Sequence, residues 1–191
     1  MLQLILGLVL FLGIHSVSIV RPHWRAQAVA RFGEVPWKLG YGAVAVIGLV
    51  LIVLGYGAAR ATDPVLLYQP PVWMRHVSLL LMLPAFTLVL AAYLPGRIRR
   101  AVKHPMLLGV KIWATAHLLA NGTLADLLLF GGFLAWAVAD RISLKRREEP
   151  SVPRAPVGKW NDAIAVVGGL GLYVAFMLFL HRWLMGVSPV G

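Results

Sequence analysis

Long apolar segments recur along this chain of 191 residues, and they constrain its fold more than any other feature. The hydrocarbon core of a bilayer requires about 20 apolar residues per helix. Five segments meet this requirement, at residues 2–20, 39–59, 72–94, 123–140 and 163–183, and residues 105–121 form a sixth at the short end of the range. Backbone polar groups inside a bilayer must be paired within the segment, which favours helices. We therefore predict an all-α polytopic membrane bundle of about six transmembrane helices, forming one domain over residues 1–191.

The composition supports this class and excludes several others. Hydrophobic residues make up 60% of the chain and charged residues only 13%, whereas soluble domains have about 45–50% and about 25%. The chain has no cysteine, which excludes disulfides, thiolate metal sites and cysteine nucleophiles. It also lacks H-E-x-x-H, G-x-S-x-G and phosphate-loop motifs. Few carboxylates lie in the apolar segments, so a proton-driven transporter is disfavoured.

The basic residues predict topology rather than a nucleic-acid partner. The formal net charge is +11, with 18 basic and 7 acidic residues. Four basic residues lie in 21–38, four in 95–104 and six in 141–162, which are alternate loops of the predicted bundle. By the positive-inside rule these loops are cytoplasmic and both termini are external. The first apolar segment has its arginines after it, so we interpret it as a retained helix rather than a signal peptide.

Two of the six histidines lie inside predicted membrane segments. Polar groups at that depth are expensive and are functional hypotheses by default. His15 and His117 are therefore candidate ligands, and the alternative is that each hydrogen-bonds a neighbouring helix. His23 lies in a basic loop predicted to be cytoplasmic, and His181 lies at the external end of the last segment, so we interpret both as interfacial residues.

The predicted depths of His15 and His117 in the bilayer allow the two residues to share a metal. His15 precedes the cytoplasmic end of its segment by five residues, and His117 precedes the external end of its own by about four. At about 1.5 Å per residue the two Cα atoms are staggered by roughly 10 Å. That spacing allows one iron, with a macrocycle around it, between two facing helices. His76 lies at a depth close to that of His117 and is the rival partner.

The segment with His117 carries further candidates. Pro105, Gly109, Trp113, His117 and Asn121 recur at every fourth residue and share one helix face. This face would suit a flat ligand, and a packing ridge that uses glycine for close approach is the alternative.

Two basic side chains of the same segment have separate interpretations. Lys111 either extends its aliphatic stem toward the cytoplasmic surface or holds an anionic group such as a propionate. His104 lies thirteen residues before His117, about 220° around the helix, so the two cannot readily share a metal unless the helix breaks.

The run "KHPMLLGVKIWATAHLLANGTLADLLLFGGFLAWAVADR" (Lys103–Arg141) closely resembles the NnrU family of bacterial membrane proteins. Residues Gly13–Tyr56, which include "RFGE", are similar to the same family. The resemblance implies a multi-pass protein of the bacterial inner membrane linked to nitrite and nitric oxide reduction. The family is related to zeta-carotene isomerase, a membrane enzyme that uses haem b to isomerise a polyene double bond.

That relative implies haem b in this protein, with His15 and His117 as the axial metal ligands. A cysteine ligand of the relative aligns with Ala114, so ligand switching through a thiolate is not available here. The remaining candidate cofactor-binding residues are Gly109, Trp113, His76, His104 and Lys111. The implied function is haem-dependent isomerase or oxidoreductase chemistry on a lipophilic small molecule, or nitric-oxide-linked metabolism, within the lipid bilayer.

Two alternatives remain open. One is a non-enzymatic membrane factor that supports expression or assembly of nitric oxide reductase through membrane protein partners. The other is methyl transfer, because "KHPMLLG" resembles the Arg-His-Pro-x-x-x-Gly signature of isoprenylcysteine-type methyltransferases, whose histidine helps to hold S-adenosylmethionine. Glu148-Glu149 resembles the acidic pair of those enzymes, but here a proline-rich loop and another apolar segment come after it.

Overall fold

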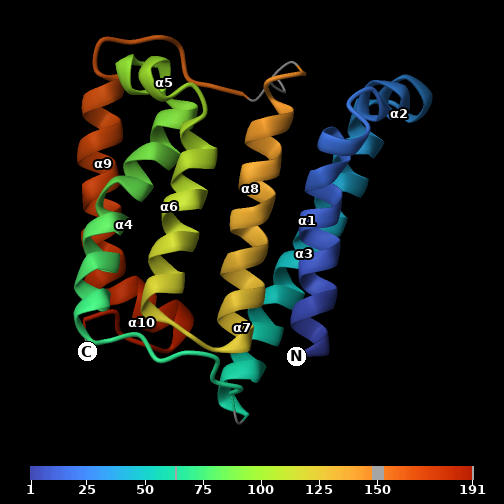
Figure 1. Cartoon of the computed structure of the whole chain (residues 1–191). Coiled ribbons are helices and arrows are strands. Elements are labelled where there is room, and N and C mark those ends of the chain that lie inside the picture. The colour runs from blue at the N-terminus through green and yellow to red at the C-terminus, as the bar shows by residue number, and fades with distance from the viewer. Residues whose placement is uncertain (63, 148–152, 191) are drawn as a thin grey trace. The chain divides into compact units, whose positions relative to one another are not determined.

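The computed structural model describes residues 1–62, 64–147 and 153–190 and is built from helices (Figure 1). Among these residues no strand forms, and the β-structure amounts to an isolated antiparallel bridge between Leu66 and Thr123. The all-α prediction is confirmed. The chain divides into two compact units, Met1–Tyr68 with Thr123–Glu148, and Gln69–Gly122 with Glu149–Gly191.

Four helical segments among the described residues are long and apolar enough to cross a membrane. They are α1 (Leu2–Val20), α3 (Glu34–Ala61), α4 (Trp73–Tyr93) and the segment Asn161–Met185. The last comprises α9 (Asn161–Ala175), a π-helical turn η2 (Phe176–Leu180) and α10 (His181–Met185). Membrane helices are thus confirmed.

Two further predicted membrane segments are also helical. Helix α6 (Pro105–Ala120) is apolar but shorter than the four candidate spans. The fifth segment consists of α7 (Leu124–Asp126), a π-helical turn η1 (Leu127–Gly131) and α8 (Gly132–Ser143). The count of about six transmembrane helices therefore remains a prediction.

Two predicted loops contain short helices. Helix α2 (Trp24–Phe32) occupies half of the first loop, and α3 begins at Glu34 rather than near residue 39. Gly33 separates the two helices with φ +88°, a value that glycine adopts without a steric penalty. An ion pair between Glu34 and Lys38, 2.8 Å apart and one turn along the helix, supports the early start of α3. Helix α5 (Arg97–Val102) lies in the third loop.

The first unit is held together by close contact between the backbones of α1 and α3. A Cβ atom added to Gly7 would lie 2.6 Å from the Ile52 nitrogen, and one added to Gly48 would lie 2.7 Å from the Phe11 nitrogen. Gly55 meets the backbone of Leu4 in the same way. Small residues allow such an approach, which increases van der Waals contact between membrane helices.

A buried carboxylate fixes the start of α7 in the same unit. Asp126 is 3% exposed. Its Oδ2 accepts hydrogen bonds from the Thr123 amide (2.9 Å) and hydroxyl (2.7 Å), and its Oδ1 accepts one from the Tyr56 hydroxyl (2.5 Å). Thr123 Oγ1 accepts in return from the Asp126 amide, which completes a capping box.

In the second unit, α4 packs against both α6 and α9. A Cβ atom on Gly109 of α6 would lie 3.3 Å from the Ala85 carbonyl oxygen, and one on Gly169 of α9 would overlap the backbone of Thr87. Ala165 is fully buried one turn before Gly169, so this small-residue pair forms a helix contact. Gly171 faces open space.

Candidate functional site

Aromatic rings surround the first predicted ligand, His15. Its ring stacks on Phe11 with a centroid distance of 4.3 Å, and it meets the edges of Tyr41 at 5.5 Å and Trp136 at 6.0 Å. His15 Nδ1 lies 2.7 Å from the Phe11 carbonyl oxygen. A carbonyl only accepts, so this contact requires the proton on Nδ1 and places the lone pair of the neutral ring on Nε2.

Beside this histidine lies a buried donor. The indole nitrogen of Trp136 is buried and has no hydrogen-bond partner among the described residues. Buried polar groups are nearly always paired, so an unpaired one calls for an explanation, such as a missing ligand or water. The aromatic surround of His15 therefore includes an N–H group able to bind an acceptor.

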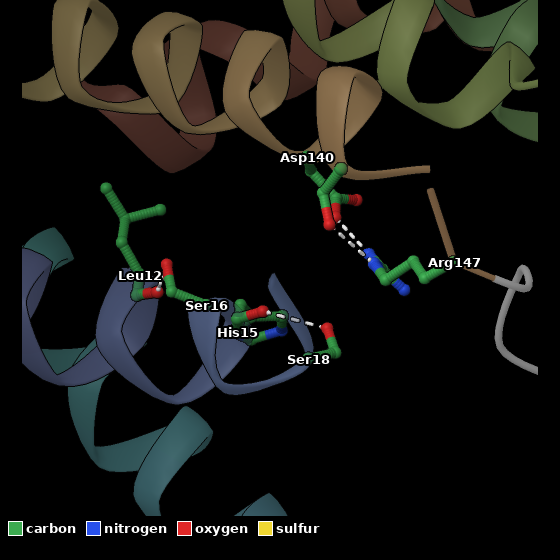
Figure 2. Close-up of polar contacts among 7 residues, drawn as sticks. Leu12, His15, Ser16, Ser18, Asp140 and Arg147 are labelled. Atoms are coloured by element: carbon green, nitrogen blue, oxygen red, sulfur yellow. Dashed lines mark hydrogen bonds and ion pairs between the residues drawn. The ribbon is translucent and has the colours of Figure 1, made fainter. Parts of the chain in front are cut away.

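Other polar side chains near this end of α1 have partners within the protein. Figure 2 shows Ser16 bonded to the Leu12 carbonyl and Ser18 bonded to the His15 carbonyl. It also shows the ion pair between Asp140 of α8 and Arg147. The Asp140 and Arg147 side chains are 13% and 8% exposed, so the pair is largely removed from solvent. From the sequence, Asp140 is recognisable only as a residue at a helix boundary.

The second predicted ligand, His117, is oriented in the same way. Its Nδ1 lies 2.8 Å from the Trp113 carbonyl oxygen, and its ring lies 5.4 Å from the Trp113 ring. Nδ1 is again the protonated nitrogen, because the carbonyl must accept. Metal-binding histidines typically donate their other ring N–H to a backbone carbonyl or carboxylate, which fixes the tautomer and the ring.

A third histidine joins His117 within the second unit. The rings of His117 and His181 are 6.4 Å apart between centroids, with only 20° between their planes. His181 Nδ1 lies 2.7 Å from the Val187 carbonyl oxygen, so this ring too has its proton on Nδ1. The sequence-based interpretation of His181 as an interfacial residue missed this pair.

The π-helical turn η2 directly precedes His181. Such a turn inserts one residue into the helix and rotates the residues after it, and π-turns occur often at functional sites. The helical periodicity of the sequence could not predict this pair of histidines, because the π-turn changes which residues share a helix face. The η1 turn ends at Gly131, five residues before Trp136.

The other predicted site residues are distributed through the second unit. Gly109 lies against α4, so its position is accounted for by helix packing. Lys111 is half-buried on α6, and His104 is the N-terminal capping position of that helix. His76 is exposed in the first turn of α4. Ala114, which stands where the relative has a cysteine ligand, is fully buried. Glu148 and Glu149 lie outside the described residues.

The pairing of His15 with His117 stays a prediction. His15 belongs to the first unit and His117 to the second. Within the part of the chain that the structure describes, no cluster of three or more His, Asp or Glu side chains is arranged to hold a metal ion.

Comparison with known proteins identifies the family. No curated protein and no solved structure is detectably similar to the chain. A family model described as "NnrU protein" matches residues 3–189. This match covers nearly the whole chain and agrees with the sequence resemblance over Gly13–Tyr56 and Lys103–Arg141. The chain therefore belongs to the NnrU protein family.

Proposed function

We propose that this NnrU-family membrane protein binds haem b, with His117 as one axial ligand, and that it acts in redox or isomerisation chemistry on a lipophilic substrate or in nitric-oxide-linked metabolism. The observation that carries the proposal is the restraint shared by both predicted ligands. His15 and His117 each direct Nδ1 at the carbonyl oxygen four residues earlier, at 2.7 and 2.8 Å. Each neutral ring thus has its proton on Nδ1 and its lone pair on Nε2, the arrangement expected of a histidine ligand.

The donor set fits a haem. Two neutral imidazoles are a common axial pair, and both aromatic stacking and an apolar surround are compatible with a macrocycle. The unpaired Trp136 nitrogen would supply a donor to an oxygen of the bound group or substrate. Haem, when bound, supplies a redox-active iron. The residues of the chain orient the imidazoles and keep Nδ1 protonated.

Two residues compete to be the second residue that would hold the haem with His117. His15 is the partner that the family resemblance implies. His181 is favoured by its ring separation of 6.4 Å from His117. At this separation His117 and His181 would both be able to hold the haem, which would supply the redox-active iron.

The visible absorption spectrum tests the proposal. Protein purified in detergent from haem-replete cells is expected to show a Soret band that His117→Ala abolishes. His15→Ala and His181→Ala then identify the second ligand, because only the variant that lacks it loses or shifts the band. His23→Ala is the matched control, since His23 is exposed in the loop before α2. It should keep the wild-type spectrum.

A colourless protein that stays colourless when hemin is added would refute haem binding and favour a non-enzymatic role. A Soret band retained in His117→Ala but lost in His76→Ala would instead support the rival ligand. Methyl transfer predicts saturable binding of S-adenosylmethionine that His104→Ala removes, with no requirement for haem.

A further inference from the structure

A pocket of about 290 Å³ opens beside α5 in the second unit, and it is lined by basic side chains. Its walls are formed by Pro95, Gly96, Arg99, Arg100, Lys103 and Val157. Among the described residues of the lining, Arg99, Arg100 and Lys103 carry a positive charge and none carries a negative one. Such a lining favours an anion, and arginine and lysine are the usual ligands of phosphate.

The pocket is built on a hydrogen-bonded frame. The Asn161 side-chain amide donates to the carbonyls of Pro95 (2.9 Å) and Pro156 (3.0 Å), and so joins the two chain segments that form opposite walls. The Ala155 amide donates to the Tyr93 carbonyl at 2.9 Å. These bonds fix the walls before any ligand arrives, which reduces the entropy lost on binding.

An acidic residue close to these cations is already engaged. Asp162 accepts hydrogen bonds from the backbone amides of Arg97 (2.7 Å) and Ile98 (3.0 Å) at the start of α5. Arg99 directs one guanidinium nitrogen at the Ala92 carbonyl, 3.3 Å away, which holds the side chain at the pocket. The carboxylate thus stabilises the frame, and positive charge predominates among the described residues of the lining.

Lys103 has a strained backbone at the edge of this pocket. Its φ of +65° is the only positive value at a non-glycine residue among those that the structure describes. With ψ −53° and a hydrogen bond of 2.8 Å from the His104 amide to the Val102 carbonyl, Lys103 is the centre of a γ-turn. This form of γ-turn is rare and strained. Glycine would occupy it without strain, so the presence of lysine there points to a role for its ammonium group.

The place of the pocket indicates the source of the anion. Its lining residues lie between the end of α4 and the start of α6 and just before α9 begins. Figure 1 shows these helix ends beside α5. Helices α4 and α9 belong to candidate membrane spans, so this level corresponds to the boundary between hydrocarbon and water. Phospholipid phosphates lie at that boundary, and basic pockets between transmembrane helices bind anionic head groups there.

We propose that this pocket, lined by Arg99, Arg100 and Lys103, binds the phosphate of an anionic phospholipid. The inference is independent of haem binding, because it uses a different set of residues and a different ligand. Free phosphate esters share the same chemistry and are the competing source.

Titration of the full-length protein in neutral detergent with phosphatidylglycerol, followed by native mass spectrometry, tests the proposal. The triple variant Arg99→Gln/Arg100→Gln/Lys103→Gln is expected to bind the lipid at least about tenfold more weakly. The control Arg141→Gln/Lys145→Gln/Arg146→Gln removes the same charge at the end of α8 and should bind as the wild type does. Equal weakening in both variants, or none in the first, would overturn the proposal.

Two further measurements sharpen the result. Lys103→Gly relieves the γ-turn, so it should weaken lipid binding without lowering the melting temperature, and unchanged binding would contradict the role of its ammonium group. Glycerol 3-phosphate is the soluble probe. If it displaces phosphatidylglycerol at concentrations similar to those of the lipid, the site recognises a soluble phosphate ester and the lipid assignment is wrong.

Discussion

At the scale of single residues, two aspartates are more buried than their positions in the sequence suggest. Asp126 and Asp140 both stand at the ends of a predicted apolar segment, where a charged residue needs no special explanation. Asp126 is nevertheless 3% exposed, and Asp140 pairs with a largely buried Arg147. A buried carboxylate is tolerated only when its oxygens are hydrogen-bonded or paired with a cation, and both residues satisfy that condition.

Tyr56→Phe tests the Asp126 cluster. The substitution removes the hydroxyl that donates to Asp126 Oδ1 and leaves that oxygen without this donor inside the protein. We expect the free energy of unfolding to fall by about 1–3 kcal/mol, the usual penalty for an unsatisfied buried group. Reversible unfolding in mixed micelles measures the change. Tyr93→Phe is the control, because Tyr93 is 44% exposed, and an equal effect there would contradict the prediction.

For the histidines, the sequence could identify candidate site residues but not the residues that surround them. Their depth in apolar segments identified His15 and His117 as unusual. It could not identify Phe11, Tyr41 and Trp136 as the surround of His15, since two of these residues lie on other helices.

At the scale of elements, glycines decide which helices touch. Helices α1 and α3 approach until their backbones are in contact at Gly7, Gly48 and Gly55. Other glycines of α3, such as Gly42 and Gly57, have no atom within 4 Å of an added Cβ. The number of glycines therefore does not predict helix packing by itself. Packing depends on the helix face on which each glycine lies.

Gly55→Ala and Gly57→Ala form a matched pair two residues apart in α3. An added methyl group at Gly55 would lie 2.8 Å from the Leu4 Cα, so the helices must separate. We expect Gly55→Ala to lower the free energy of unfolding by about 1–3 kcal/mol, as overpacking does. Gly57→Ala should be neutral or stabilising by about 1 kcal/mol, because alanine has the higher helix propensity. Equal melting temperatures for the two variants would show that α1 and α3 are not in close contact.

At the scale of the whole molecule, the charge pattern predicts a single orientation across the membrane. The basic loops at 21–38, 95–104 and 141–162 are expected in the cytoplasm, with the N-terminus outside. Because the chain contains no cysteine, introduced cysteines can be labelled one at a time without a background.

Val65→Cys and Ala101→Cys test this topology. Both positions are exposed, the first in the predicted external loop between α3 and α4 and the second in α5. A membrane-impermeant maleimide added to intact spheroplasts should label Val65→Cys at once and Ala101→Cys only after lysis. The reverse pattern would place the N-terminus in the cytoplasm.

The long helices could be predicted from the sequence, whereas some short elements and turns could not. The helices α1, α3 and α4 follow from hydropathy, and α3 differs mainly in starting at Glu34 after the turn at Gly33. The short helix α5 and the two π-helical turns were not predicted. A six-residue helix has too few residues to establish a period, and a π-turn depends on packing that adjusts the helix register.

By itself the sequence determined the all-helical membrane class, the family, the expected orientation and the prominence of His15 and His117. These properties depend on contiguous runs of residues and on local motifs, which a linear reading captures. Only the tertiary structure brought His181 beside His117, enclosed His15 in aromatic rings and gathered Arg99, Arg100 and Lys103 around one pocket. Each of these depends on how turns and helix contacts place the side chains, and hydropathy does not encode that placement.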